Sequence, residues 1–452
     1  MTEEKKYSYW INSAFYSMLQ RLTVMVFGIA SFMVLSRTLT QGQRGVWDLF
    51  LMITANIELF RQALVRNAYV KFLNSSPDPE IPSIRSAALA LNTVITLVII
   101  LALGIFTVPF CEFLHAPELI PVVYIFIVGI FILIPFSHFE WTQSAYTDFR
   151  GIFWAYMIRQ SSWFIMMIIH LLIFGEITLT QLSMYYTLGI VVGTIASFQF
   201  VKKYLSKGFI VSMVWIKNLW NFGRIIFGSS LSTFLFRNAD QLLIPRMLNT
   251  AVLAVYTTSL RIINILDLPS LVISEIMFPK SARVAAFGSE SHLKYLYEKS
   301  VGSVLSLLLP ACAIILIFPQ LFIIILAGKQ YLGAVVILRV MLVNSLFSAF
   351  LKQFATVMDS SGRARINFRL ISAMAILCTI LCWIFLRSLH NPIGAAYALI
   401  LTHAFGFCIS QFFLYKYFKV NFLNTFKYAL AFYPEMIRII KDKTQSTWRT
   451  IF

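Results

Sequence analysis

Charged side chains stand near the middle of several long apolar segments, where they could bind a phosphate or an ion. They are Arg21, Glu58, Arg61, Arg237, Asp240, Arg261 and Asp267. A charge at the centre of a bilayer costs roughly 2.5–3.5 kcal/mol on insertion scales, so it normally pairs or faces a water-filled cavity. Because these positions repeat between the two halves of the chain, we expect them to line one central cavity.

The basic members of this set suit phosphate recognition. A guanidinium group pairs bidentately with phosphate oxygens and stays charged. The predicted phosphate-binding residues are Arg21, Arg61, Arg237 and Arg261, and the predicted rim residues are Arg37, Arg66 and Arg246. A structural role is equally open, because Glu58 and Arg61, like Arg237 and Asp240, lie three residues apart on one helix face. Arg159 and Arg339 lie near predicted helix ends, where they can snorkel, so no function is expected of them.

The acidic members could bind a coupling proton or Na⁺. The first candidates for ion coupling are Asp240 and Asp267, and the next are Glu58 and Glu275. A fixed ion pair is the alternative for each carboxylate. Pro269 lies two residues after Asp267 and predicts a kink there. No metal site and no cofactor other than the coupling ion is expected.

The composition indicates a polytopic all-α membrane protein. Hydrophobic residues make up 59% of the chain and charged residues 12%, against about 25% charged residues in a soluble domain. About 20 apolar residues span a bilayer. About twelve such windows are predicted, at 11–36, 46–70, 86–108, 119–139, 152–174, 179–201, 226–246, 251–277, 300–326, 333–357, 366–388 and 392–415.

Lysine and arginine gather in alternate loops, including Lys352 to Arg369, which predicts that both termini are cytoplasmic. The net charge of +18 is therefore explained by basic cytoplasmic loops that contact anionic lipid. No nucleic-acid partner is expected. The same pattern predicts a multi-pass membrane protein.

An internal repeat places Glu58 opposite Asp267 and Val46-Trp47 opposite Val255-Tyr256. Six spans per half give a parallel repeat, with two six-helix bundles around a cationic cavity. The predicted divisions are an N-terminal bundle (1–201), a cytoplasmic linker (202–225), a C-terminal bundle (226–418) and a basic amphipathic tail on the membrane surface (419–452).

Three stretches resemble the multidrug/oligosaccharidyl-lipid/polysaccharide (MOP) exporter superfamily. They are Leu35-Ser36-Arg37-Thr38-Leu39 through Gly45-Val46-Trp47, Arg237 to Ile244 through Ala254-Val255-Tyr256, and Phe278-Pro279. Within that superfamily the chain is most similar to Wzx-type flippases. The resemblance implies a cavity lined by the first, second, seventh and eighth helices. It also implies a flippase that carries an undecaprenyl-diphosphate-linked oligosaccharide, such as an O-antigen unit, to the periplasmic leaflet by alternating access. Membrane lipids and other membrane proteins of polysaccharide assembly are the implied partners.

Two alternatives stay open from the sequence. An ion-coupled multidrug exporter of the same superfamily would favour an acidic, aromatic cavity without a cationic excess. A membrane enzyme, such as a polysaccharide polymerase, would be expected to carry a long external loop, and the predicted outside loops are short. We therefore expect a transporter and not an enzyme.

Overall fold

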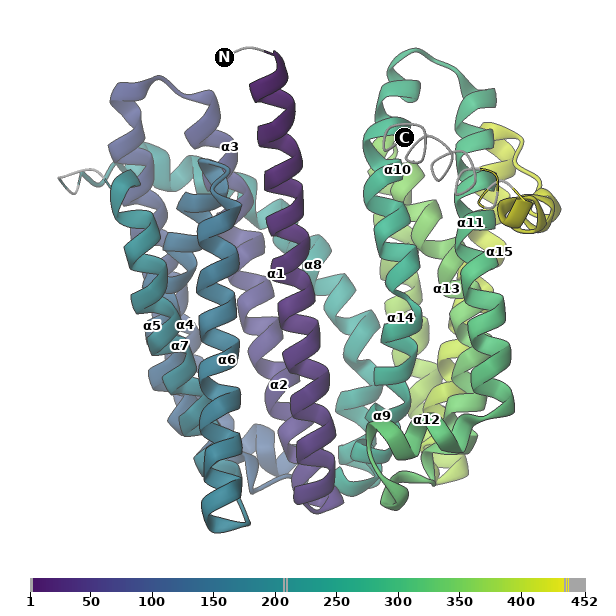
Figure 1. Cartoon of the computed structure of the whole chain (residues 1–452), viewed down its shortest axis with the longest axis horizontal. Helices are drawn as coiled ribbons and strands as arrows, with labels where there is room; N and C mark the ends of the chain where they lie inside the picture. Colours follow the sequence, from purple (N-terminus) through teal and green to yellow (C-terminus); the bar gives the residue numbers. More distant parts are fainter. Residues whose placement is uncertain (1–2, 206–207, 209, 435, 437, 439–452) are drawn as a thin grey trace, which may run out of the picture. The chain divides into compact units, whose positions relative to one another are not determined.

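The computed structural model describes residues 3–205, 208, 210–434, 436 and 438 (Figure 1). Every regular element within these ranges is a helix, as the composition predicted. By their contacts the residues form two units. The first is Met1–Phe234 with Asn249–Ala254, and the second is Leu235–Leu248 with Val255–Phe452. The bundle, linker and tail limits expected from the sequence stay predictions.

The first unit holds seven helices and the beginning of an eighth. They are α1 (Glu3–Thr38), α2 (Gln41–Arg61), α3 (Asn67–Ser75), α4 (Ile81–Phe113), α5 (Leu119–Ala145), α6 (Phe149–Phe174), α7 (Leu179–Val201) and the first part of α8 (Met213–Met247). Helix α7 packs against α5 and α6, and α1 packs against α6. Short 3₁₀ turns, Asp78–Glu80 and Lys202–Tyr204, precede α4 and follow α7.

The second unit holds the rest of α8, the part of α9 that follows Ala254, and the remaining helices. They are α9 (Thr250–Leu266), α10 (Leu268–Ala286), α11 (Glu290–Ile317), α12 (Pro319–Leu326), α13 (Ala334–Ser360), α14 (Ala364–Leu389) and α15 (Ile393–Phe418). A 3₁₀ turn, Lys329–Tyr331, precedes α13. The core forms where α10, α11, α13 and α15 meet, around residues such as Val301, Phe354 and Leu414.

Among the described residues, nine helices are long and apolar enough to cross a membrane, or ten if α9 and α10 form one bent span. The two other predicted windows, 46–70 and 226–246, lie on α2–α3 and α8. Both carry several charged residues, including Arg61 and Arg66 on the first and Arg237 and Asp240 on the second. The count of twelve spans therefore stays a prediction.

The second helix of each predicted half is interrupted close to its acidic residue. A π-helical turn, Gln62–Arg66, separates α2 from α3 just after Glu58. A 41° bend separates α9 from α10 at Asp267. Pro269 occupies the second position of α10, so the predicted kink is confirmed. Because proline cannot supply a helical N–H and crowds the preceding turn, the break falls just before it.

Side chains outside the spans fix several helix ends. Thr40 and Gln43 form a capping box at the start of α2, and Thr178 and Gln181 form another at α7, where they satisfy otherwise unpaired amides. Asp148 caps α6 by accepting from the Gly151 amide at 3.2 Å and from Lys203 Nζ at 2.8 Å. Burial opposes ionisation of Asp148, but these hydrogen bonds outweigh it and lower the pKa of the carboxyl.

The beginning of the predicted tail is a helix, 423–434, that packs on α11. A Cβ atom on Gly302 would lie 2.8 Å from the Thr425 carbonyl oxygen, so the two helices approach closely. Glu298 accepts from the Asn421 amide at 2.9 Å, and Tyr433 donates to the Ser306 carbonyl at 2.5 Å. Residues 435, 437 and 439–452 of the predicted tail lie outside the described residues.

The first part of α8 packs on the π-helical turn through Gly223. A Cβ atom at this position would lie 1.8 Å from the Leu64 carbonyl oxygen, whereas one on Gly228 of the same helix would meet nothing within 4 Å. Leu219, one turn earlier, is fully buried in a cluster with Val65 and Trp141. The absence of a side chain at Gly223 therefore permits this contact between α8 and the interrupted second helix.

We predict that Gly223→Ala lowers the unfolding temperature in detergent, because the methyl group forces α8 away from Leu64. Overpacking of this kind costs about 1–3 kcal/mol. Gly228→Ala is the matched control, and it should be neutral or slightly stabilising because alanine favours helix interiors by about 0.5–1 kcal/mol. Equal unfolding temperatures for the two variants would contradict the close packing at Gly223.

Candidate functional site

Most of the predicted phosphate-binding and rim arginines lie at the surface of their own unit. Arg21 on α1 and Arg237 on α8 are exposed, and Arg261 on α9 is partly exposed. The rim residues Arg37 and Arg246 are exposed, whereas Arg66 is partly buried in the π-helical turn. These residues are wholly or partly exposed, and phosphate binding at their positions stays a prediction.

Arg61 differs from the other three predicted phosphate-binding residues. Its side chain is 0% exposed at the end of α2. Its Nη2 donates to Asn92 Oδ1 at 2.9 Å and to the Leu133 carbonyl at 3.0 Å, which ties α2 to α4 and α5. A phosphate cannot reach this group in the present conformation. We therefore correct the prediction and assign Arg61 a structural role inside the first unit.

Glu58 pairs with a distant helix and not with Arg61. Its Oε1 accepts from Arg159 Nη2 of α6 at 2.7 Å. Arg159 is only 3% exposed, and its guanidinium carbon lies 4.9 Å from the centre of the Phe136 ring. The prediction that Arg159 snorkels to the surface is therefore wrong. A buried arginine needs a counter-charge, and Glu58 provides it.

Glu140 is a buried acid that the sequence analysis missed. Its Oε2 accepts from the Tyr156 hydroxyl at 3.0 Å, and its Oε1 lies 3.9 Å from Arg66 Nη2. The predicted window ended at residue 139, whereas α5 continues to Ala145. A longer helix would have placed Glu140 inside the span. The predicted rim residue Arg66 therefore lies beside an acid of its own unit.

Asp267 also pairs within its own unit. Its Oδ2 lies 2.7 Å from Lys352 Nζ of α13, directly at the bend between α9 and α10. Lys352 was predicted among the charges of the following loop, but the residue lies within α13. The adjacent Gln353 donates to the Ser270 carbonyl at 3.1 Å and to Ser274 Oγ at 3.0 Å. Helix α13 thus fixes the beginning of α10 through two neighbouring side chains.

Asp240 is buried without a basic partner. It is 3% exposed, and no Lys, Arg or His among the described residues lies within ion-pair distance of it. The Tyr256 hydroxyl donates to its Oδ2, and the Gln241 amide donates to its Oδ1 at 2.8 Å. Arg237 is exposed while Asp240 is buried, so the predicted structural pair between them is not formed. Glu275, the remaining predicted coupling acid, is exposed on α10.

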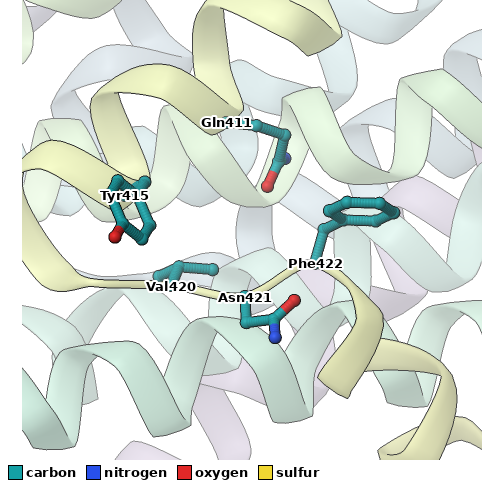
Figure 2. Close-up of a pocket in the computed structure, with 5 residues that line it drawn as sticks. All are labelled: Gln411, Tyr415, Val420, Asn421 and Phe422. Carbon is teal, nitrogen blue, oxygen red and sulfur yellow. The ribbon is translucent and has the colours of Figure 1, made fainter.

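The predicted residues do not line the cavity that opens beside the end of α15. Figure 2 shows that cavity, of about 350 Å³, between Gln411 and Tyr415 of α15 and the segment Val420, Asn421 and Phe422. Its lining carries no formal charge, and Gln411 donates to the Tyr297 hydroxyl at 3.1 Å. A neutral lining is unsuited to binding a diphosphate, so this cavity is not the predicted anion site.

A family model for polysaccharide biosynthesis proteins matches residues 34–336. This range contains most of the charged positions described above, from Arg37 to Glu275, and covers more than half of the chain. The chain belongs to the polysaccharide biosynthesis protein family. No curated protein matches it by sequence.

Solved structures share the fold of this polysaccharide biosynthesis protein. The lipid II flippase MurJ, in an inward closed conformation, matches with a TM-score of 0.77 at 12% identity, over 92% of this chain and 90% of that one. An inward-facing multidrug resistance MATE family transporter of the MOP superfamily matches with a TM-score of 0.75 at 14% identity, over 88% and 96%. A MOP superfamily transporter from Pyrococcus furiosus matches with 0.61 at 14% identity, over 89% and 95%. The MOP fold implied by the sequence motifs is therefore confirmed.

We predict that Arg159→Gln and Glu58→Gln each lower the unfolding temperature of this family member. Either change leaves a buried charge without its partner, which costs about 3–5 kcal/mol. The double variant should lose less than the sum of the two, since neither charge then remains. Arg387→Gln, at an exposed position on α14, is the control and should leave the unfolding temperature unchanged. Strict additivity of the two single effects would contradict the pairing.

Proposed function

We propose that this protein is a flippase for an undecaprenyl-diphosphate-linked oligosaccharide, the precursor of O-antigen or another surface polysaccharide. It would move this lipid from the cytoplasmic to the periplasmic leaflet of the bacterial inner membrane by alternating access. The observation that carries the proposal is the family match over residues 34–336 on a chain with the MOP fold. The family's role in polysaccharide biosynthesis indicates the substrate class, and the fold shared with a flippase and a transporter indicates transport.

Accessible arginines support binding of the diphosphate. Arg21, Arg237 and Arg261 are the proposed contacts, since each is at least partly exposed while Arg61 is enclosed. Guanidinium groups can form two parallel hydrogen bonds to one phosphate, and they stay charged at every physiological pH. Arg37 and Arg246 are exposed and could attract the anion before it binds.

For energy coupling, we propose Asp240 as the first site for a proton or Na⁺. Glu58 and Asp267 are already neutralised by Arg159 and Lys352, whereas Asp240 has only neutral hydrogen-bond donors. Protonation would remove the cost of a buried unpaired charge. No other cofactor is proposed, and membrane lipids and other polysaccharide-assembly proteins are the proposed partners. A cation-coupled drug exporter remains the second candidate, because a MATE transporter shares the fold.

Leaflet transfer in proteoliposomes tests the proposal. Wild-type protein should transfer an undecaprenyl-diphosphate oligosaccharide, and Arg237→Glu/Arg261→Glu should reduce the rate more than tenfold, because charge-assisted hydrogen bonds contribute about 1.5–3 kcal/mol each. Arg387→Glu, another exposed arginine of the second unit, should retain the wild-type rate.

Equal transfer by the wild type and the double variant would overturn the arginine site. Absence of transfer by the wild type, with several glycans and with an imposed ion gradient, would overturn the flippase. Extrusion of a cationic dye under the same conditions would then identify the drug exporter.

A further inference from the structure

A groove of about 230 Å³ lies between α10 and α11, within the second unit. Helix α10 contributes Ile273, Ile276 and Lys280, which follow one face at intervals of three and four residues. Ile276 is 56% exposed, so the groove has an apolar side that is open at the surface of the unit. Lys280 lies close to the end of α10 and is exposed.

The facing side of the groove carries polar groups next to Leu296. Helix α11 contributes this leucine together with Lys299, Ser300 and Ser303, and the three polar residues share one face. The Ser303 hydroxyl donates to the Lys299 carbonyl at 2.9 Å, so that hydroxyl oxygen can still accept a hydrogen bond. Lys299 Nζ lies 5.7 Å from the centre of the Tyr295 ring, one turn earlier on the same helix. Two lysines, one from each helix, therefore line this small space.

The hairpin geometry places these cations at the end of an apolar surface. Residues 287–289 join α10 to α11, and the two helices run antiparallel (Figure 1). By their sequence positions, both lysines lie toward the connected end. The predicted topology places this end at the cytoplasmic face. Val272, on the turn of α10 before Ile276, is also 56% exposed. A ligand that fits must therefore carry a negative head group and an apolar chain.

We propose that this groove binds an anionic phospholipid of the cytoplasmic leaflet. Lys280 and Lys299 contact the phosphate, the Ser300 hydroxyl donates to a phosphate or glycerol oxygen, and an acyl chain lies along Ile273 and Ile276. Basic pockets between membrane helices on the cytoplasmic side recognise lipid head groups in this way. A soluble phosphate would leave the apolar side uncovered, and a zwitterionic lipid would place its own cation next to the two lysines.

Native mass spectrometry of the full-length protein, titrated with phosphatidylglycerol or phosphatidylcholine, tests the site. Wild-type protein should bind phosphatidylglycerol more tightly. Lys280→Gln/Lys299→Gln should weaken that binding by about fivefold for each lysine removed, with phosphatidylcholine binding unchanged. Lys280→Arg/Lys299→Arg should keep the preference, which separates loss of charge from loss of folding.

The matched control is Lys202→Gln/Lys217→Gln, which removes the same charge from exposed residues of the first unit. It should leave phosphatidylglycerol binding unchanged.

An equal loss in both glutamine pairs would overturn the groove in favour of diffuse surface attraction. Unchanged phosphatidylglycerol binding by Lys280→Gln/Lys299→Gln would overturn it as well. Displacement of phosphatidylglycerol by equimolar undecaprenyl diphosphate would assign the groove to the transported lipid instead. The proposed transport function is measured separately, so either proposal can fail alone.

Discussion

A charge buried among apolar helices is stabilised by a counter-charge or by hydrogen bonds, and such contacts join helices within both units. In the first unit Arg159 is paired with Glu58, and Glu140 is held by Tyr156 and faces Arg66. In the second unit Asp267 is paired with Lys352. Removing one partner of a buried pair typically costs about 3–5 kcal/mol, roughly a fifth or more of the stability of an ordinary domain. These contacts therefore determine which helices stay together.

The same contacts divide the intramembrane arginines into two groups. Arg61 and Arg159 are enclosed and have their partners within the first unit. Arg21, Arg237 and Arg261 remain wholly or partly exposed. A transporter for a diphosphate lipid needs cations that the substrate can reach, and it also needs rigid bundles that can move against one another. In the proposed function, internal pairing would make each unit rigid, and the exposed arginines would supply the cations. Asp240 differs from the paired acids, because the hydrogen bonds that it accepts come from neutral donors.

The helical fold and the position of the α9–α10 bend could be predicted from local sequence alone. Long apolar windows specify helices in a membrane, because every backbone amide must be satisfied within the segment. Pro269 predicted the bend locally as well, because proline cannot supply a helical N–H and crowds the preceding turn. The ion pairs could not be predicted, because each pair joins two different helices: Glu58 with Arg159, and Asp267 with Lys352. The local sequence of one helix does not determine which other helix it packs against. Glu140 was not predicted because α5 continues beyond its most apolar stretch. Lys352 lies inside the predicted window 333–357 but was counted with the loop charges. A single sequence carries no covariation that would connect such positions.

The most direct test of the division between enclosed and accessible arginines compares Arg61→Gln with Arg261→Gln. Both unfolding temperature and affinity for undecaprenyl diphosphate would be measured on the purified proteins. Arg261→Gln should weaken binding about tenfold or more, since one charge-assisted hydrogen bond contributes about 1.5–3 kcal/mol, with little change in unfolding temperature. Arg61→Gln should lower the unfolding temperature, because Asn92 and Leu133 lose their donor. It should leave the affinity unchanged, because Arg61 is enclosed. Weakened binding by Arg61→Gln at an unchanged unfolding temperature would contradict the account.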